Sequence, residues 1–206
     1  LDVVRDEPAL LEAAFTRAAR EADAIITSGG VSVGEADFTK TMMKQLGDVA
    51  FWRIAMRPGR PMAVGRVSGT KTASSQHRMA AISSYFDSQS ATVATPPLGQ
   101  MIGGDAGDAG DKDIPGAILF GLPGNPVAVM VTFLAFVRPA LLRMMGCTTP
   151  APPLLRAVCQ EALRKKPGRT EYQRGIVSTA ADGTLQVRTT GNQGSGVLSS
   201  MVQGNG

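Results

Sequence analysis

The 206-residue chain has few of the side chains that form disulfides or bind transition metals: it contains two cysteines and one histidine. Cys147 and Cys159 flank a proline-rich stretch, which favours a reduced, cytosolic protein over a disulfide framework. With only His77 to help, they cannot complete a zinc site, so oxygen ligands are expected for any bound metal. A single histidine also argues against a Ser-His-Asp hydrolase.

Long apolar segments are lacking as well. No apolar run is both long enough and free enough of charge to span a bilayer, and no signal peptide is visible. The chain starts at Leu1 instead of a methionine, which suggests a fragment. Its 43% hydrophobic and 18% charged residues suit a globular protein of one or two domains, so we expect a cytoplasmic protein without a membrane partner.

The net charge of +4 is unevenly distributed. From Ala151 onward there are seven basic and three acidic residues, so the surplus belongs to this C-terminal segment and the remainder is neutral. Nucleic-acid binding favours aromatic residues among the basic ones, and Tyr172 is the only one here. The basic segment is therefore interpreted as a solvated face or a small-anion site, with no nucleic-acid partner.

A glycine-rich loop, TSGGVSVGEADFTK at 27–40, is the most informative stretch. The apolar run 22–26 predicts a buried strand before it, and Phe38, Met42 and Leu46 share one face of a predicted helix after it. Glycines let a ligand approach the main chain, and free N–H groups at a helix start attract anions. The stretch therefore predicts a phosphate-binding loop.

Two carboxylates, Glu35 and Asp37, lie beside this predicted anion loop. A divalent cation bridging carboxylates to phosphate would resolve the conflict of charge. Alternatively, Asp37 only caps the helix and Glu35 is a solvated loop residue.

The pattern of strand, glycine loop and helix recurs at 118–137. Asn125 can cap the second helix, with Pro126 at its first position. The run 127–137 is apolar nearly all round and too short for a membrane span; Pro139 is expected to kink or break this helix, and Gly146 to end it. Two such loops at one edge of a parallel sheet would face one crevice, the usual ligand position in open α/β folds.

A cationic turn lies between two predicted strands, 49–56 and 62–67. Its sequence, Arg57-Pro58-Gly59-Arg60-Pro61, is a rigid turn with guanidinium groups suited to an oxyanion. Charged residues at a solvated turn are the alternative. After this turn, residues 68–115 have no sustained period and are interpreted as an insertion.

The chain start is interpreted as the end of a strand at 1–4, then a helix from Pro8 to about Ala22 with Asp6 or Glu7 as its cap. Leu11, Phe15 and Ala18 or Ala19 mark the apolar stripe of this helix. A strand, helix and strand in this order predict a parallel, right-handed crossover and hence an α/β fold. Beyond a linker at 149–153, predicted strands at 154–163, 172–178 and 185–189 indicate a small all-β module. The predicted domains are 1–147 and 150–206.

Five motifs in order then reveal a resemblance: TSGGVSVGEADFTK, FWRIAMRPGRP, GLPGNPVAV, RKKPGRTEYQRG and TGNQGSGVLSSM. The chain resembles the molybdopterin molybdenumtransferases, the family of MoeA and the gephyrin E-domain, over nearly all residues outside the insertion. The resemblance implies a three-layer, MogA-like molybdopterin-binding domain with a mostly parallel sheet, followed by a small barrel-like β domain. It also implies the C-terminal half of a longer homodimeric protein, which follows an adenylyltransferase of the same pathway.

The implied activity is insertion of molybdate into adenylylated molybdopterin with release of AMP, assisted by magnesium or, alternatively, zinc. The resemblance implies the following sites: catalytic Asp37, Asp6 and Arg57; substrate-binding Thr27, Ser28, Gly29, Gly30, Ser32, Glu35, Pro123, Gly124, Asn125 and Pro126; molybdate-binding Arg57, Arg174 and Ser195; and metal-binding Asp6 and Asp37.

Two other functions stay open from the sequence. The chain could be a non-catalytic molybdopterin-binding or scaffold module, which would bind without turnover. It could instead be an adenylyltransferase, which would consume ATP and release pyrophosphate.

Overall fold

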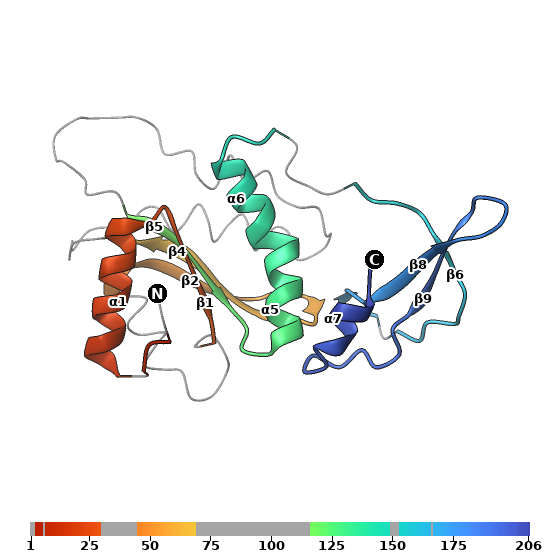
Figure 1. The fold of residues 1–206 in the computed structure, drawn as a ribbon. Coiled ribbons are helices and arrows are strands. Elements are labelled where there is room, and N and C mark those ends of the chain that lie inside the picture. Colours follow the sequence, from red (N-terminus) through yellow and green to blue (C-terminus); the bar gives the residue numbers. More distant parts are fainter. Residues whose placement is uncertain (1–2, 6, 30–44, 69–115, 149–152, 166) are drawn as a thin grey trace. The chain divides into compact units, whose positions relative to one another are not determined.

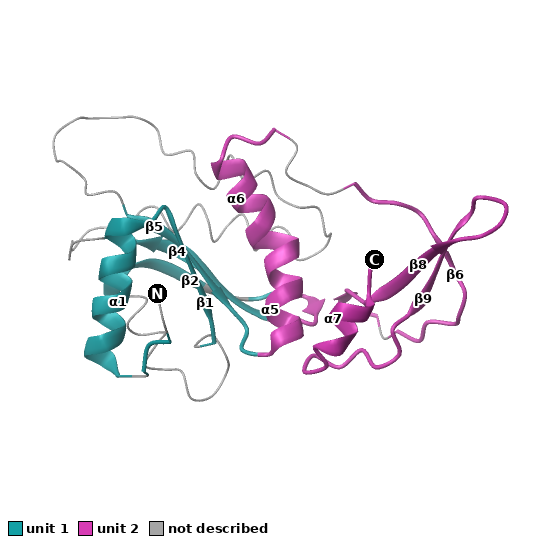
Figure 2. Ribbon diagram, viewed as in Figure 1, with its two compact units in different colours: residues 1–54, 61–124 teal, residues 55–60, 125–206 magenta. Residues whose placement is uncertain are grey.

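The computed structural model describes residues 3–5, 7–29, 45–68, 116–148, 153–165 and 167–206. The chain divides into two compact units (Figure 2). Unit 1 comprises 1–54 and 61–124, and unit 2 comprises 55–60 and 125–206.

Unit 1 begins with helix α1, Pro8–Glu21, as the sequence predicts (Figure 1). Glu7 occupies the N-cap position, although its side chain makes no capping hydrogen bond within the described residues. Pro8 suits the first turn because a backbone N–H there would lack a helical partner. A strand was expected at the chain start, but Val3 and Val4 lie outside any strand. The described residues therefore show no strand before α1 that could form the predicted crossover with β1.

The sheet of unit 1 has the order β1-β5-β4-β2. Its strands are β1 Ala24–Ser28, β2 Gly47–Arg53, β4 Pro61–Val67 and β5 Ala117–Leu122. β1 and β5 are parallel, whereas β4 is antiparallel to both β5 and β2. The α/β class is confirmed, but the described sheet is mixed and not mostly parallel.

The antiparallel pairing of β2 and β4 has a simple physical cause. Only residues 54–60 connect the two strands, whereas a parallel crossover needs a dozen or more residues. The short cationic turn therefore forces the chain to reverse direction, and parallel pairing of β2 with β4 is excluded.

The core of unit 1 lies between α1 and the sheet (Figure 1). Its buried side chains come from one face of the helix and from all four strands: Phe15, Ala18, Ala19, Ile25, Val49, Ala63, Val67, Ala117 and Leu119. Leu11, predicted on the apolar stripe of the helix, packs against this cluster partly buried. The helical period of the sequence thus correctly predicts the buried face of α1.

Unit 2 contains a helical run made of α5 Pro126–Thr132, a π-helical segment η1 Phe133–Val137 and α6 Arg138–Met144. Pro139 was expected to kink or break this helix, and a break is wrong because the run continues past it. The amide of Arg138 bonds five residues back to the carbonyl of Phe133, a π-type step. Such a step is a known way to accommodate a proline, which removes one helical donor.

The end of α6 agrees with the prediction for Gly146. This glycine has φ +87°, and its N–H donates to the carbonyl of Arg143. The N–H of Cys147 donates to the carbonyl of Leu142. These two bonds form a Schellman motif, which satisfies the last helical carbonyls. The whole run Pro126–Met144 has 19 residues and a hydropathy of 1.8, long and apolar enough for a membrane span, contrary to expectation; a buried core helix meets the same criterion.

The C-terminal part of unit 2 has short strands: β6 Val158–Cys159, β7 Thr170–Glu171, β8 Gly175–Thr179 and β9 Leu185–Thr189. Three of them form a sheet of order β6-β9-β8, and β7 pairs with β3 Met56–Arg57. The predicted long strand at 154–163 is reduced to β6, and within the described residues no closed barrel is formed. Helix α7, Ser199–Gln203, was not expected.

A core substitution on α1 tests this description of unit 1. Phe15 is 6% exposed and Leu10 is 45% exposed on the same helix. Phe15→Ala should lower the free energy of unfolding by about 3–5 kcal/mol, because it removes buried apolar contacts and leaves a cavity. Leu10→Ala is the matched control and should cost about 1 kcal/mol or less. Urea unfolding measures both, and equal losses would contradict the assigned core face.

Candidate functional site

The first part of the candidate site lies where β1 and β5 end in unit 1. Ser28 is in register with Leu122, and the Gly29 N–H donates to the Leu122 carbonyl at 3.0 Å. Because the two strands are parallel, the loops that follow them leave the same edge of the sheet. Gly29 has φ +93°, a conformation that favours glycine. The predicted shared edge is therefore confirmed where the two loops begin, at Gly29 and Pro123, and the rest of the first loop lies outside the described residues.

The two loops approach each other closely at their glycines. A Cβ added at Gly124 would lie 3.8 Å from the Gly29 Cα. Nearby in the sequence, Pro123 is buried, and Ser28 is exposed at the end of β1. The Thr27 hydroxyl is buried without a hydrogen-bond partner in the described part of the chain, a state that costs about 1–3 kcal/mol.

The remaining residues predicted around the first loop cannot be located. Gly30, Ser32, Glu35, Asp37 and Asp6 lie outside the described residues. Among the residues that the structure does describe, no group of three or more His, Cys, Asp or Glu side chains could hold a metal ion. The predicted metal site at Asp6 and Asp37 therefore stays a prediction.

The second part of the candidate site lies at the start of α5 in unit 2. Asn125 occupies the N-cap position, as predicted, but its side chain does not cap the helix within the described residues. Its Nδ2 instead donates to the Ser195 Oγ at 3.4 Å. The Val127 N–H, which has no partner inside the helix, donates to the Ser195 carbonyl at 3.2 Å. Ser195, 70 residues further along, thus supplies a main-chain cap.

The cationic turn also contacts α5. β3 pairs with β7 in parallel, and the Tyr172 N–H donates to the Arg57 carbonyl at 2.9 Å. Gly59, with φ +99°, lies so close to α5 that an added Cβ would be 2.5 Å from the Thr132 Oγ1. The segment that carries Arg57, whose side chain is exposed, is therefore held between β7 and the second turn of α5.

Arg174 is 5% exposed, and its guanidinium is engaged inside unit 2. Nε donates to the Ser200 Oγ at 3.0 Å, and Nη2 donates to the Gly194 carbonyl at 3.2 Å. Burial lowers the pKa of Arg174 from its ordinary value, yet an arginine stays cationic at neutral pH. Arg174 thus holds the residue before Ser195, and its predicted direct contact with molybdate stays a prediction.

Two residues of this arrangement were not found by sequence reasoning. Ser200 accepts the Arg174 Nε bond and is 2% exposed, and Gln193 bonds to the backbone of Arg174. Their only sequence signal is their place in the TGNQGSGVLSSM motif. Their partner, Arg174, lies 19 and 26 residues earlier in the chain, so local pattern could not reveal the contacts.

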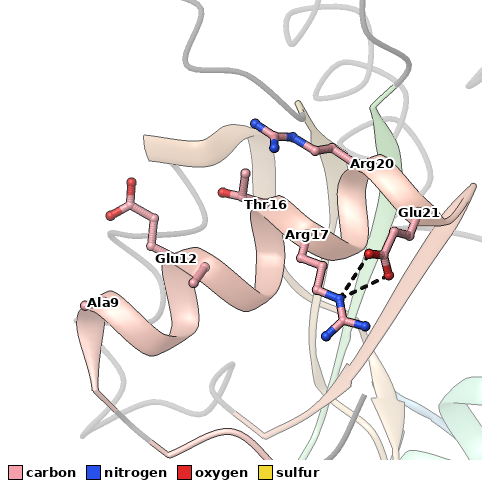
Figure 3. Close-up of a pocket in the computed structure, with 7 residues that line it drawn as sticks. Ala9, Glu12, Thr16, Arg17, Arg20 and Glu21 are labelled. Carbon is pink, nitrogen blue, oxygen red and sulfur yellow. Dashed lines mark hydrogen bonds and ion pairs between the residues drawn. The ribbon is translucent and has the colours of Figure 1, made fainter.

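A shallow pocket lies on α1 and contains none of the predicted site residues (Figure 3). It is lined by Ala9, Glu12, Ala13, Thr16, Arg17, Arg20 and Glu21. Arg17 and Glu21 form an exposed ion pair at 3.1 Å, a type of pair that contributes only about 0.3–0.5 kcal/mol. Since one helix provides all of the lining, this surface does not define a binding site.

The fold and these loops define an α/β protein with a C-terminal β module, and comparisons with known proteins identify its family. Residues 1–143 match the family model described as probable molybdopterin binding domain, and residues 156–206 match the MoeA C-terminal region (domain IV). The chain therefore belongs to the molybdopterin-binding domain family, in the MoeA-like group that functions in molybdenum cofactor biosynthesis.

Curated relatives support this family. A molybdopterin molybdenumtransferase from Haemophilus influenzae is 33% identical over 206 residues, which are 100% of this chain and 39% of the relative. Molybdopterin molybdenumtransferase 2 from Mycobacterium tuberculosis is 31% identical over 85% of this chain and 33% of its own length. The chain thus spans well under half the length of these relatives.

A solved structure supports the fold. The molybdopterin biosynthesis MoeA protein from Pyrococcus horikoshii superposes with a TM-score of 0.55 at 20% identity. The match covers 100% of this chain and 37% of that protein. At 20% identity this comparison supports the α/β fold alone.

The contact between Gly59 and α5 can be tested by adding one methyl group. Gly59→Ala should lose about 1–3 kcal/mol more free energy of unfolding than Gly146→Ala, because only the new methyl at 59 meets a neighbour. Both glycines have positive φ, so Gly146→Ala is a control for backbone strain. Adding Thr132→Ala should recover part of the loss at 59. Equal losses for the two glycine variants in urea unfolding would contradict the contact.

Proposed function

We propose that this chain is the catalytic part of a molybdopterin molybdenumtransferase, which inserts molybdate into adenylylated molybdopterin and releases AMP. The observation that supports this most is the junction at the start of α5. There Ser195, in the region matched by the MoeA C-terminal model, contacts Asn125 and Val127, in the region matched by the molybdopterin-binding model. Residues of both family regions thus form one local arrangement.

The chemistry asks the protein mainly for positioning and charge stabilisation. Release of AMP breaks a pyrophosphate bond, and molybdate is a dianion that must be held beside the dithiolene of the substrate. The N–H group of Gly124 is suited to a phosphate, whereas the Gly29 N–H already donates to the Leu122 carbonyl. The exposed guanidinium of Arg57 is suited to an oxyanion. Backbone hydrogen bonds hold the segments that carry these donors: Gly29 is bonded to Leu122 in unit 1, and the Arg57 carbonyl accepts from Tyr172 in unit 2.

A divalent cation, magnesium or alternatively zinc, is assigned by resemblance to Asp6 and Asp37. When bound there, it would polarise the phosphoryl oxygens. Both aspartates lie outside the described residues. We also propose the division into domains 1–147 and 150–206, a homodimeric full-length protein in the cytoplasm, and supply of its substrate by an adenylyltransferase.

The activity is tested by molybdate-dependent release of AMP from adenylylated molybdopterin. This chain should be compared with a version extended at its N-terminus to the length of its relatives, because it spans only 39% of the Haemophilus influenzae protein. AMP release that requires molybdate supports the proposal. Binding without turnover in both versions would favour a molybdopterin-binding or scaffold module, and ATP consumption with pyrophosphate release would favour an adenylyltransferase.

An arginine variant tests the proposed oxyanion site in the active version. Arg57→Ala should lower kcat/KM for molybdate by about 10²–10³-fold, because a preorganised cation at the reacting anion is lost. Arg57→Lys should retain part of the activity, since the charge stays but the planar fork does not. Arg188→Ala, at an exposed arginine on β9, is the matched control and should change little. Equal losses of kcat/KM in the Arg57→Ala and Arg188→Ala variants would contradict the assignment of Arg57 to the oxyanion site.

A further inference from the structure

We propose that Gln193 is the residue that positions Ser195 at the start of α5. The positioning itself does not depend on the proposed function; only its expected effect on the KM for molybdate rests on that function. The Gln193 side chain contacts both backbone groups of Arg174. Its Oε1 accepts from the Arg174 N–H at 2.8 Å, and its Nε2 donates to the Arg174 carbonyl at 3.1 Å. Nε2 also donates to the Thr190 Oγ1 at 3.1 Å.

Two of these three bonds attach the loop 190–196 to Arg174, which directly precedes β8, and the third lies within the loop. The same loop is held from other directions: the Arg174 Nη2 binds the Gly194 carbonyl, and the Asn192 Oδ1 accepts from the Gly194 N–H at 2.9 Å. Gln193 is the centre of this set. Its side chain binds the backbone of Arg174, and the Arg174 guanidinium binds the carbonyl of Gly194, the next residue after Gln193. The loop and the arginine therefore hold each other in place.

The loop contacts α5 at its next residue. The Ser195 carbonyl accepts from Val127, and the Ser195 hydroxyl accepts from Asn125. A rotation of the loop would break both contacts together and leave the Val127 N–H without its cap. Gln193 thus acts on the site through Ser195 and is a positioning residue.

An amide is required at this position for a chemical reason. Gln193 donates to two oxygens and accepts from one N–H with a single side chain, which only an amide can do at this length. An ionised glutamate of the same shape would keep the acceptor, but it would place a carboxylate oxygen against the Arg174 carbonyl and remove both donated bonds. Gln193→Glu therefore removes the positioning with almost no change in volume.

Amide hydrogen exchange at Val127 provides a readout that does not depend on activity. The Val127 N–H has no partner inside α5, so its protection reports the contact with Ser195. Gln193→Glu and Gln193→Ala should each speed this exchange about tenfold or more. Gln160→Ala, which removes the bond of another glutamine to Gln186 near the start of β9, is the matched control and should change it by less than about twofold.

The outcomes separate this inference from the proposed function. Unchanged Val127 exchange in both Gln193 variants would overturn the positioning role, whatever the activity. Faster exchange, without any turnover by the unsubstituted protein, would support the positioning role and count against the transferase. In an active protein, the KM for molybdate should rise about tenfold in Gln193→Glu and stay unchanged in Gln160→Ala; a fall in kcat alone would overturn the catalytic consequence.

Discussion

The arrangement of unit 2 depends on one backbone requirement: the first N–H groups of a helix have no partner inside it. In α5 the proline at 126 removes one of these donors, and the carbonyl of Ser195 satisfies the next one, at Val127. A residue near the end of the chain is thereby tied to the loop that follows β5. This cap is one of the contacts that join the C-terminal segment to the helical run within unit 2.

The cationic turn meets the same helix from another direction. Residues 55–60 leave unit 1 between β2 and β4 and belong to unit 2, where they pair with β7 and pack Gly59 against α5. The first two turns of α5 therefore organise the segments that carry Arg57 and Ser195. In unit 1 the parallel pair β1 and β5 does the same for the two glycine loops, because parallel strands end at one edge.

Pro139 and Gln193 affect this structure through the hydrogen bonds of the backbone more than through the size of their side chains. Pro139 is accommodated by the π-type bond from Arg138 to Phe133, so an apolar helix continues where a break was expected. Gln193 substitutes for main-chain pairing by binding both backbone groups of Arg174. Arg174 itself is buried, and its charge is used to hold a loop carbonyl within unit 2.

The sequence by itself determined the α/β class, helix α1 with its buried face, the strand–loop–helix unit at 118–137 and the family, because these depend on local periodicity and on motifs. The sequence analysis did not predict the mixed sheet, although the short link 54–60 carries that information. It also did not predict helix α7 or the reduction of the strand at 154–163 to β6. Only the tertiary structure decided that Ser195 caps α5, that Arg174 is buried and that Gln193 holds both. Those contacts join residues up to 70 positions apart, and their geometry depends on packing that no local pattern records.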